Sequence, residues 1–144
     1  MNKININQRR RARKLALQAL YQWQMSHSDL FEIEAQCRTA NKMERLDEAY
    51  FKELLHEIPN QLELIEQTFS VYLDRKVSEL NPIELTALRI GTYELLKKLE
   101  VPYKVAINEA VELNKEFGTV DGYKYVNSIL DKVAQKTRQA EIRG

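Results

Sequence analysis

Apolar residues recur every three or four positions along almost the whole chain, and no sustained stretch alternates apolar and polar residues between turn signals. This spacing is typical of amphipathic helices, so the fold is expected to be all-helical (all-α). Seven helices are predicted, over residues 8–25, from Ser28 or Asp29 onward, from Asp47 to Pro59, over 60–73, 82–99 and 103–117, and from Asp121 onward.

Several helix ends carry recognisable signals. Asn81 is a favourable N-cap, Pro82 fits the first helical position, and Glu84 has the spacing that completes a capping box. Pro59 is expected to end its helix, because proline disfavours helical backbone angles in the residue before it. Gly118 suits the position just beyond a helix end. These signals support the predicted boundaries independently of the apolar spacing.

The segment 82–99 is apolar on most of its surface, which predicts that it lies at the centre of the fold. Gly91 lies within this helix, where a glycine costs about 1 kcal/mol relative to alanine. We therefore expect Gly91 to admit a closely packed neighbouring helix. No linker or repeat divides the 144 residues, so a single domain over 1–144 is expected.

The formal net charge of +1 conceals an uneven distribution of charge. Residues 1–14 contain six Lys or Arg, the first of them Lys3, and no acidic residue, which leaves 16 basic and 21 acidic residues in the other 130. A basic arm on an acidic body is expected when one end of a protein meets phosphates. The single cysteine, Cys37, the lack of a long apolar run and the polar N-terminus predict a cytoplasmic protein without membrane segments.

A helical wheel of residues 8–25 separates a buried face from an exposed one. The buried face is predicted to contain Ala12, Leu15, Ala16, Ala19, Leu20 and Trp23. The exposed face is predicted to contain Arg10, Lys14, Gln18 and an exposed Tyr21 in one line, with Arg13 at its edge and Leu17 beside Tyr21. Arginines in the opening turns oppose the helix macrodipole, so their presence needs another explanation.

Basic residues for phosphates, an amide for a base edge and an aromatic ring for stacking together suit single-stranded RNA. The alternative is a solvated terminus whose charges only aid solubility. A membrane anchor fits less well, because the apolar face is rich in alanine and is needed by the core. Reading of the DNA major groove would normally require a recognition helix within a helix-turn-helix.

Three stretches resemble the NusB family of bacterial transcription antitermination factors. They are "RRRARKLALQALYQWQ" at the start, "LRIGTYELLKKLEVPYKVAINEAVELNKEFG" over 88–118 and "KYVNSILDKVA" over 124–134. The resemblance implies about seven helices in two packed bundles, and a non-catalytic RNA-binding adaptor. It also implies binding to boxA RNA of nascent ribosomal transcripts, together with a small-subunit ribosomal protein called NusE. Within the antitermination complex of RNA polymerase, this binding promotes read-through of terminators.

The resemblance also implies functional residues. Its RNA-binding face corresponds to Arg9, Arg10, Arg11, Arg13, Gln18 and Tyr21, with further RNA contacts at Asp121, Lys124 and Tyr125. The helical wheel adds Lys14 to the predicted RNA-binding residues. Glu84 corresponds to a position used against NusE. Alternatives are open at three of these residues: Asp121 can be an N-cap, Tyr125 can pack in the core, and Glu84 can complete a capping box. The family contains monomers and homodimers, so a homodimer is possible.

The main rival function is enzymatic, or that of an accessory domain like those fused to ribosomal RNA cytosine methyltransferases. The glycines form neither a dinucleotide-binding motif nor a P-loop. His27, His56 and Cys37 lack metal-ligand spacing, and no serine lies in a nucleophile motif. We therefore predict no catalysis, no cofactor and no metal.

Overall fold

The computed structural model describes residues 5–144, so Lys3 of the basic arm lies outside the described residues. Over the described residues the chain forms eight α-helices and two short 3₁₀ helices without a strand, which confirms the all-helical prediction. The chain divides into two compact units, one that ends at Asn60 and one over Gln61–Gly144. They are called the first and second unit below, and each is described by itself. The expectation of a single domain over 1–144 stays a prediction.

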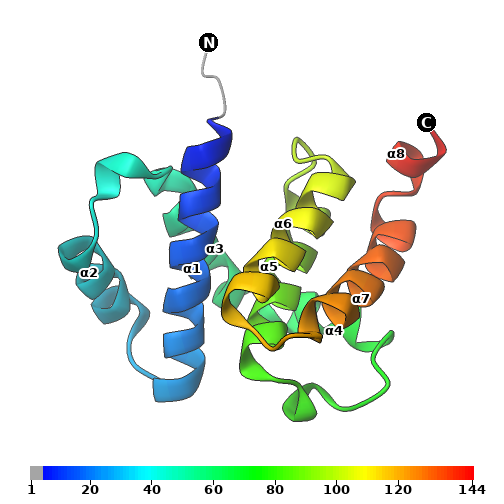
Figure 1. Cartoon of the computed structure of the whole chain (residues 1–144), viewed down its shortest axis with the longest axis horizontal. Coiled ribbons are helices and arrows are strands. Elements are labelled where there is room, and N and C mark those ends of the chain that lie inside the picture. Colours follow the sequence, from blue (N-terminus) through cyan, green and yellow to red (C-terminus); the bar gives the residue numbers. More distant parts are fainter. Residues whose placement is uncertain (1–4) are drawn as a thin grey trace. The chain divides into compact units, whose positions relative to one another are not determined.

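The first unit consists of α1 (Ile6–Ser26), α2 (Leu30–Ala40), the 3₁₀ helix η1 (Met43–Arg45) and α3 (Glu48–Asn60). α1 packs against both α2 and α3, and α2 also contacts α3 (Figure 1). The predicted buried face of α1 is confirmed at Ala12, Leu15, Ala16, Ala19 and Leu20, whereas Trp23 is half-buried.

Three helix ends of this unit test the predicted boundaries. The side chain of Asn5 accepts a hydrogen bond from the backbone N–H of Gln8 at 2.9 Å, so α1 begins two residues earlier than predicted. Asp29 caps α2, as one of the two predicted alternatives. The prediction that Pro59 ends its helix is wrong by one residue, because α3 continues to Asn60. A proline in the last turn removes only one backbone bond, and burial of the preceding Ile58 holds that residue in the helix.

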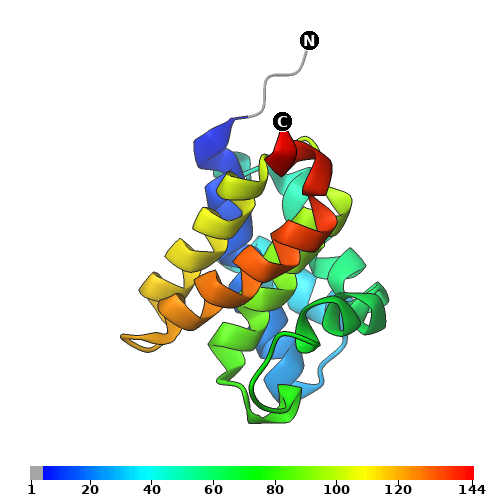
Figure 2. The same cartoon turned by 90° about the vertical axis from the view of Figure 1, so that its right-hand side faces the viewer.

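The second unit consists of α4 (Leu62–Ser70), the 3₁₀ helix η2 (Val77–Glu79), α5 (Pro82–Lys97), α6 (Tyr103–Phe117), α7 (Gly122–Thr137) and α8 (Gln139–Arg143). α5 contacts α4, α6 and α7, and every residue from Glu84 to Leu95 is buried, which confirms its central position. Figure 2 shows α6 and α7 side by side and antiparallel. α4 ends three residues earlier than predicted, and the five-residue α8 was not predicted.

Gly91 lies where neighbouring helices of this unit approach α5 closely. A Cβ atom at this position would lie 2.6 Å from Cδ1 of Leu130 on α7 and 3.2 Å from Cβ of Ala110 on α6. The first distance is shorter than any ordinary contact between carbon atoms. The prediction that Gly91 admits a close neighbour is therefore confirmed, with α7 as the nearer helix.

Arg138, between α7 and α8, ties together helix ends of the second unit. Its side chain is 3% exposed and donates to three backbone carbonyls around the end of α5, at 2.8 Å to Leu95, 3.1 Å to Glu94 and 3.0 Å to Lys98. It also pairs with Glu141 at 2.5 Å, and the other oxygen of Glu141 accepts from the N–H of Tyr103 at 2.8 Å. The carbonyls of Glu94 and Lys98 also accept the backbone N–H groups of Lys98 and Val101, so Arg138 adds to the hydrogen bonds at this helix end. Glu141 satisfies the N–H of Tyr103, which the start of α6 leaves unpaired.

Among residues 5–144, no helix combines the length and the apolar character that crossing a membrane requires.

Candidate nucleic-acid interface

The exposed face of α1 is basic along its first half. The helix has five cations and no acidic residue in its 21 positions. Exposed side chains on it include Arg10, Arg11, Lys14 and Gln18. The prediction that Arg10, Lys14 and Gln18 lie on the exposed face of this helix is therefore confirmed. Tyr21 is half-buried, so the predicted exposed aromatic ring is available to solvent only in part.

Arg9 and Arg13 face the interior of the first unit instead. Arg9 pairs with Asp47 at 3.4 Å, and its guanidinium lies 3.9 Å from the centre of the Tyr50 ring on α3. Arg13 is 3% exposed, and its guanidinium lies 5.6 Å from the same ring. Its predicted position at the edge of the exposed face is therefore wrong. Leu17, predicted on the same face, is also buried, because α1 buries more of its circumference than a single face.

Asp47 joins the start of α3 to the start of α1. Its Oδ1 accepts from the backbone N–H of Tyr50 at 3.1 Å, while Oδ2 takes the ion pair with Arg9. Its own backbone N–H donates to the carbonyl of Gln8 at 3.1 Å. One of the cations that oppose the α1 dipole is thus paired within the fold, and the opening turns of α1 are held against α3.

The connection between α2 and α3 brings further basic residues to α1. Nη1 of Arg11 donates to the backbone carbonyl of Arg45 at 2.9 Å, which holds η1 beside α1. Lys42 precedes η1 and is exposed, as is Arg45. Neither residue was predicted from the sequence, because only the folding of this connection against α1 brings them to the basic face.

In the second unit, Asp121 and Lys124 lie at the start of α7. The carboxylate of Asp121 is 82% exposed and lies 3.6 Å from Nζ of Lys124. Asp121 occupies the N-cap position, but its side chain makes no capping hydrogen bond, and its backbone has helical angles of φ −104° and ψ −2°. An N-cap side chain normally needs an extended backbone, so the alternative of an N-capping aspartate is wrong.

Tyr125 is half-buried and held by polar contacts. Its hydroxyl donates to Oδ1 of Asp74 at 2.9 Å, and the guanidinium of Arg75 lies 4.6 Å from its ring centre. The hydrogen bond from Arg75, followed by that from Tyr125, lowers the pKa of Asp74 from 3.8 to about 2. Burial and the neighbouring carboxylate raise the pKa of Tyr125. The ring therefore joins α7 to the segment between α4 and η2.

Glu84 lies near the same end of α7. Asn81 caps α5 as predicted, because its side chain accepts from the N–H groups of Ile83 and Glu84. The carboxylate of Glu84 lies against Gly122 instead of completing a capping box, since a Cβ atom on Gly122 would be 2.5 Å from its Oε1. Glu84 is 9% exposed. The capping-box alternative is therefore wrong, and the partner contact at Glu84 stays a prediction.

Within residues 5–144, no group of three His, Cys, Asp or Glu side chains could hold a metal ion.

Comparison with known proteins gives a consistent result. The family model described as the NusB family matches residues 10–135. The chain is 54% identical over 142 residues to transcription antitermination protein NusB of Legionella pneumophila strain Corby, covering 99% of this chain and 97% of the relative. It is 50% identical over 135 residues to the protein of that name from Pseudomonas fluorescens strain Pf0-1, covering 94% and 81%. The fold is also similar to a solved structure of T. maritima NusB, with a TM-score of 0.81 and 29% sequence identity. This match covers 100% of each of the two chains.

Proposed function

This chain belongs to the NusB family of transcription antitermination proteins, and we propose that it acts as an RNA-binding adaptor without catalytic activity. In this proposal it binds boxA-type single-stranded RNA together with the ribosomal protein NusE. The complex then joins the antitermination complex of RNA polymerase on nascent ribosomal transcripts and promotes read-through. Because bacterial transcripts are made in the cytoplasm, this proposed role places the protein there.

One observation carries the proposal: α1 combines five cations with no acidic residue and keeps Arg10, Arg11, Lys14 and Gln18 exposed. Cations near the start of a helix are repelled by the positive end of its dipole, and a bound anion would offset this repulsion. Phosphates along an RNA strand supply that anion repeatedly, and the amide of Gln18 can bond a base edge or a sugar hydroxyl.

The arginines of α1 have two roles in this proposal. Arg10 and Arg11, with Lys14, contact the RNA backbone from the exposed side. Arg9 and Arg13 support the site from the interior, because their contacts with Asp47 and Tyr50 hold α1 in place. The half-buried Tyr21 stacks one base with the part of its ring that solvent reaches.

Asp121, Lys124 and Tyr125 form the second set of proposed RNA contacts. Lys124 is exposed and supplies a cation, and the ring of Tyr125 remains in part accessible beside Arg75. Glu84 is proposed as a contact to NusE. A homodimer that covered the α1 face would compete with RNA, so RNA binding should favour the monomer.

The test is a titration of fluorescently labelled boxA-type RNA with the protein, with and without NusE, at two salt concentrations. Two proteins that contact one strand should bind it more tightly than either alone, because the second contact needs less additional ordering. A coupling of about 1–3 kcal/mol, or 5- to 150-fold in affinity, would be typical. RNA should then tighten the contact with NusE by the same factor, as calorimetry can measure.

A scrambled RNA of the same length is the control for general attraction to phosphates. The proposal requires tighter binding of the boxA-type RNA and a gain in affinity when NusE is added. Equal binding of both RNAs would reduce α1 to a non-specific phosphate-binding surface. Independent binding of RNA and NusE would contradict the adaptor mechanism.

A further inference from the structure

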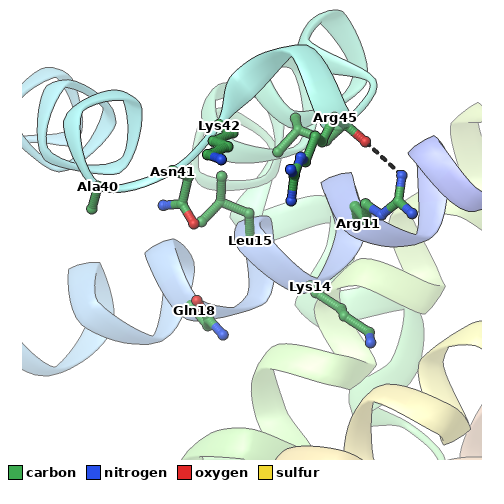
Figure 3. Close-up of a pocket in the computed structure, with 9 residues that line it drawn as sticks. Arg11, Lys14, Leu15, Gln18, Ala40, Asn41, Lys42 and Arg45 are labelled. Atoms are coloured by element: carbon green, nitrogen blue, oxygen red, sulfur yellow. Dashed lines mark hydrogen bonds between the residues drawn. The ribbon is translucent and has the colours of Figure 1, made fainter.

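A basic pocket of about 370 Å³ lies in the first unit, between α1 and the connection from α2 to α3. Its polar lining consists of Arg11, Lys14 and Gln18 from α1 and of Asn41, Lys42 and Arg45 from the connection (Figure 3). Four of these six side chains are cations, and no residue of the lining is acidic. The pocket is therefore a concentration of positive charge that extends beyond α1.

Backbone groups hold the walls of this pocket in place. Arg11 donates to the carbonyl of Arg45, drawn as the dashed line in Figure 3. The side chain of Asn41 donates to the carbonyl of Cys37 at the end of α2, at 2.9 Å. The N–H of Asp47 bonds to the carbonyl of Gln8. The connection is thus fixed to both α1 and α2 without using the charged groups of Lys42 and Arg45.

Asp47, which follows the lining residue Leu46 in the sequence, is already engaged, because it pairs with Arg9. Arg11 uses one N–H for the carbonyl of Arg45, and a guanidinium has five such donors. Figure 3 shows the side chain of Arg45 extending from η1 toward α1, so that Arg11 and Arg45 approach the pocket from two elements. Cations gathered in this way repel one another, and a bound anion would relieve that repulsion.

We propose that this pocket receives a phosphodiester group of the RNA strand, with Lys42 and Arg45 as RNA-contacting residues that extend the α1 face. This inference rests on the proposed function. A planar guanidinium matches the oxygens of a phosphate in a bidentate arrangement, and the ammonium of Lys42 adds a point charge. The volume exceeds that of a single phosphate and accommodates the attached sugar, whose hydroxyls can bond the amides of Gln18 and Asn41.

Residues shared by the α1 face and the pocket define a continuous path for the RNA strand. Lys14 and Gln18 belong both to the exposed line on α1 and to the pocket, so a strand that follows α1 reaches η1 without a gap. The lining has no aromatic side chain on which a base could stack. The pocket therefore binds the backbone of the RNA, and bases are contacted elsewhere.

The experiment compares the wild-type protein with the double variant Lys42→Ala/Arg45→Ala in titrations of labelled boxA-type RNA from 0.1 to 1 M salt. Removal of one phosphate contact reduces the salt slope of log affinity by about 0.7, which corresponds to about fivefold weaker binding at 0.1 M salt. The difference should vanish near 1 M. Both positions are exposed, and Arg11 bonds the carbonyl of residue 45 whatever its side chain, so folding should be unchanged.

The matched control is Lys132→Ala/Lys136→Ala, which removes two exposed cations from the second half of α7. Equal effects of the two double variants would overturn the inference, because they would reflect total charge alone. An unchanged slope in Lys42→Ala/Arg45→Ala, with wild-type binding intact, would overturn the pocket but leave the proposed function standing. Failure of the wild-type protein to bind boxA-type RNA would instead refute the proposed function and the pocket with it.

Discussion

Arg9 and Arg10 are adjacent in sequence, yet the structure assigns them different tasks, and alanine substitutions should separate these. Arg9 has a side chain that is 13% exposed, pairs with Asp47 and lies 3.9 Å from the centre of the Tyr50 ring. Arg10 is exposed on the face proposed to contact RNA. Arg9→Ala should therefore lower the free energy of unfolding, whereas Arg10→Ala should weaken RNA binding.

The expected magnitude follows from the contacts of Arg9. A largely desolvated cation–π contact is worth about 1–2 kcal/mol, and the ion pair with the 30% exposed Asp47 adds at most about 1 kcal/mol. Arg9→Ala should thus cost about 1–3 kcal/mol. In a chain of this length that lowers the melting temperature by about 2–12 °C. Arg10→Ala, at an exposed position, should change stability by less than about 0.5 kcal/mol.

Urea denaturation followed by circular dichroism measures the stabilities, and an RNA titration well below the melting temperature measures binding. Arg9→Lys is the matched control, because it keeps the charge for Asp47 but lacks the planar group that stacks on Tyr50; its loss should be intermediate. Equal stability losses in Arg9→Ala and Arg10→Ala would refute this division of roles. So would an unchanged stability of Arg9→Ala.

Three further predictions concern the second unit. Gly91→Leu should destabilise the fold by about 1–3 kcal/mol, because overpacking against Leu130 outweighs the gain in helix propensity; a melting temperature at or above that of the wild type would contradict this. Arg138→Ala should cost about 2–3 kcal/mol in urea denaturation, since it removes a buried guanidinium that bonds three carbonyls around the end of α5; a loss below about 1 kcal/mol would show that water replaces it. The contacts of Asp74 lower its pKa in the folded protein from 3.8 to about 2. They should therefore stabilise the fold above pH 4, and this stabilisation should be lost as the pH falls toward 2. An NMR titration midpoint of this carboxyl near 3.8 would be inconsistent with the contacts.

The sequence predicted the helices best where local chemistry determines the structure. Asn81 and Pro82 set the start of α5, and the apolar surface of α5 indicated its central position. The five-residue α8 was missed because it is too short for a periodic pattern. Its position depends on Glu141, which bonds the N–H of Tyr103, 38 residues away in the sequence, and a bond of this range leaves no local signal.

The candidate site was predictable only along α1. A helical wheel correctly separated Arg10, Lys14 and Gln18 from the apolar face. It could not show that Arg13 is buried beside Tyr50, because this depends on how α3 packs against α1. The pocket residues Lys42 and Arg45 likewise reach α1 only through the fold of the α2–α3 connection.

The most direct test of the central claim, that the exposed face of α1 binds RNA phosphates, is the salt dependence of boxA-type RNA binding by Arg10→Ala/Lys14→Ala. Because this variant lacks the two cations that would each neutralise a phosphate, the slope of log affinity against log salt should become shallower by about 1.4, while stability stays nearly unchanged. Tyr21→Ala serves as the contrast, because loss of stacking should weaken binding without altering the slope. A slope for Arg10→Ala/Lys14→Ala equal to that of the wild-type protein would contradict the account.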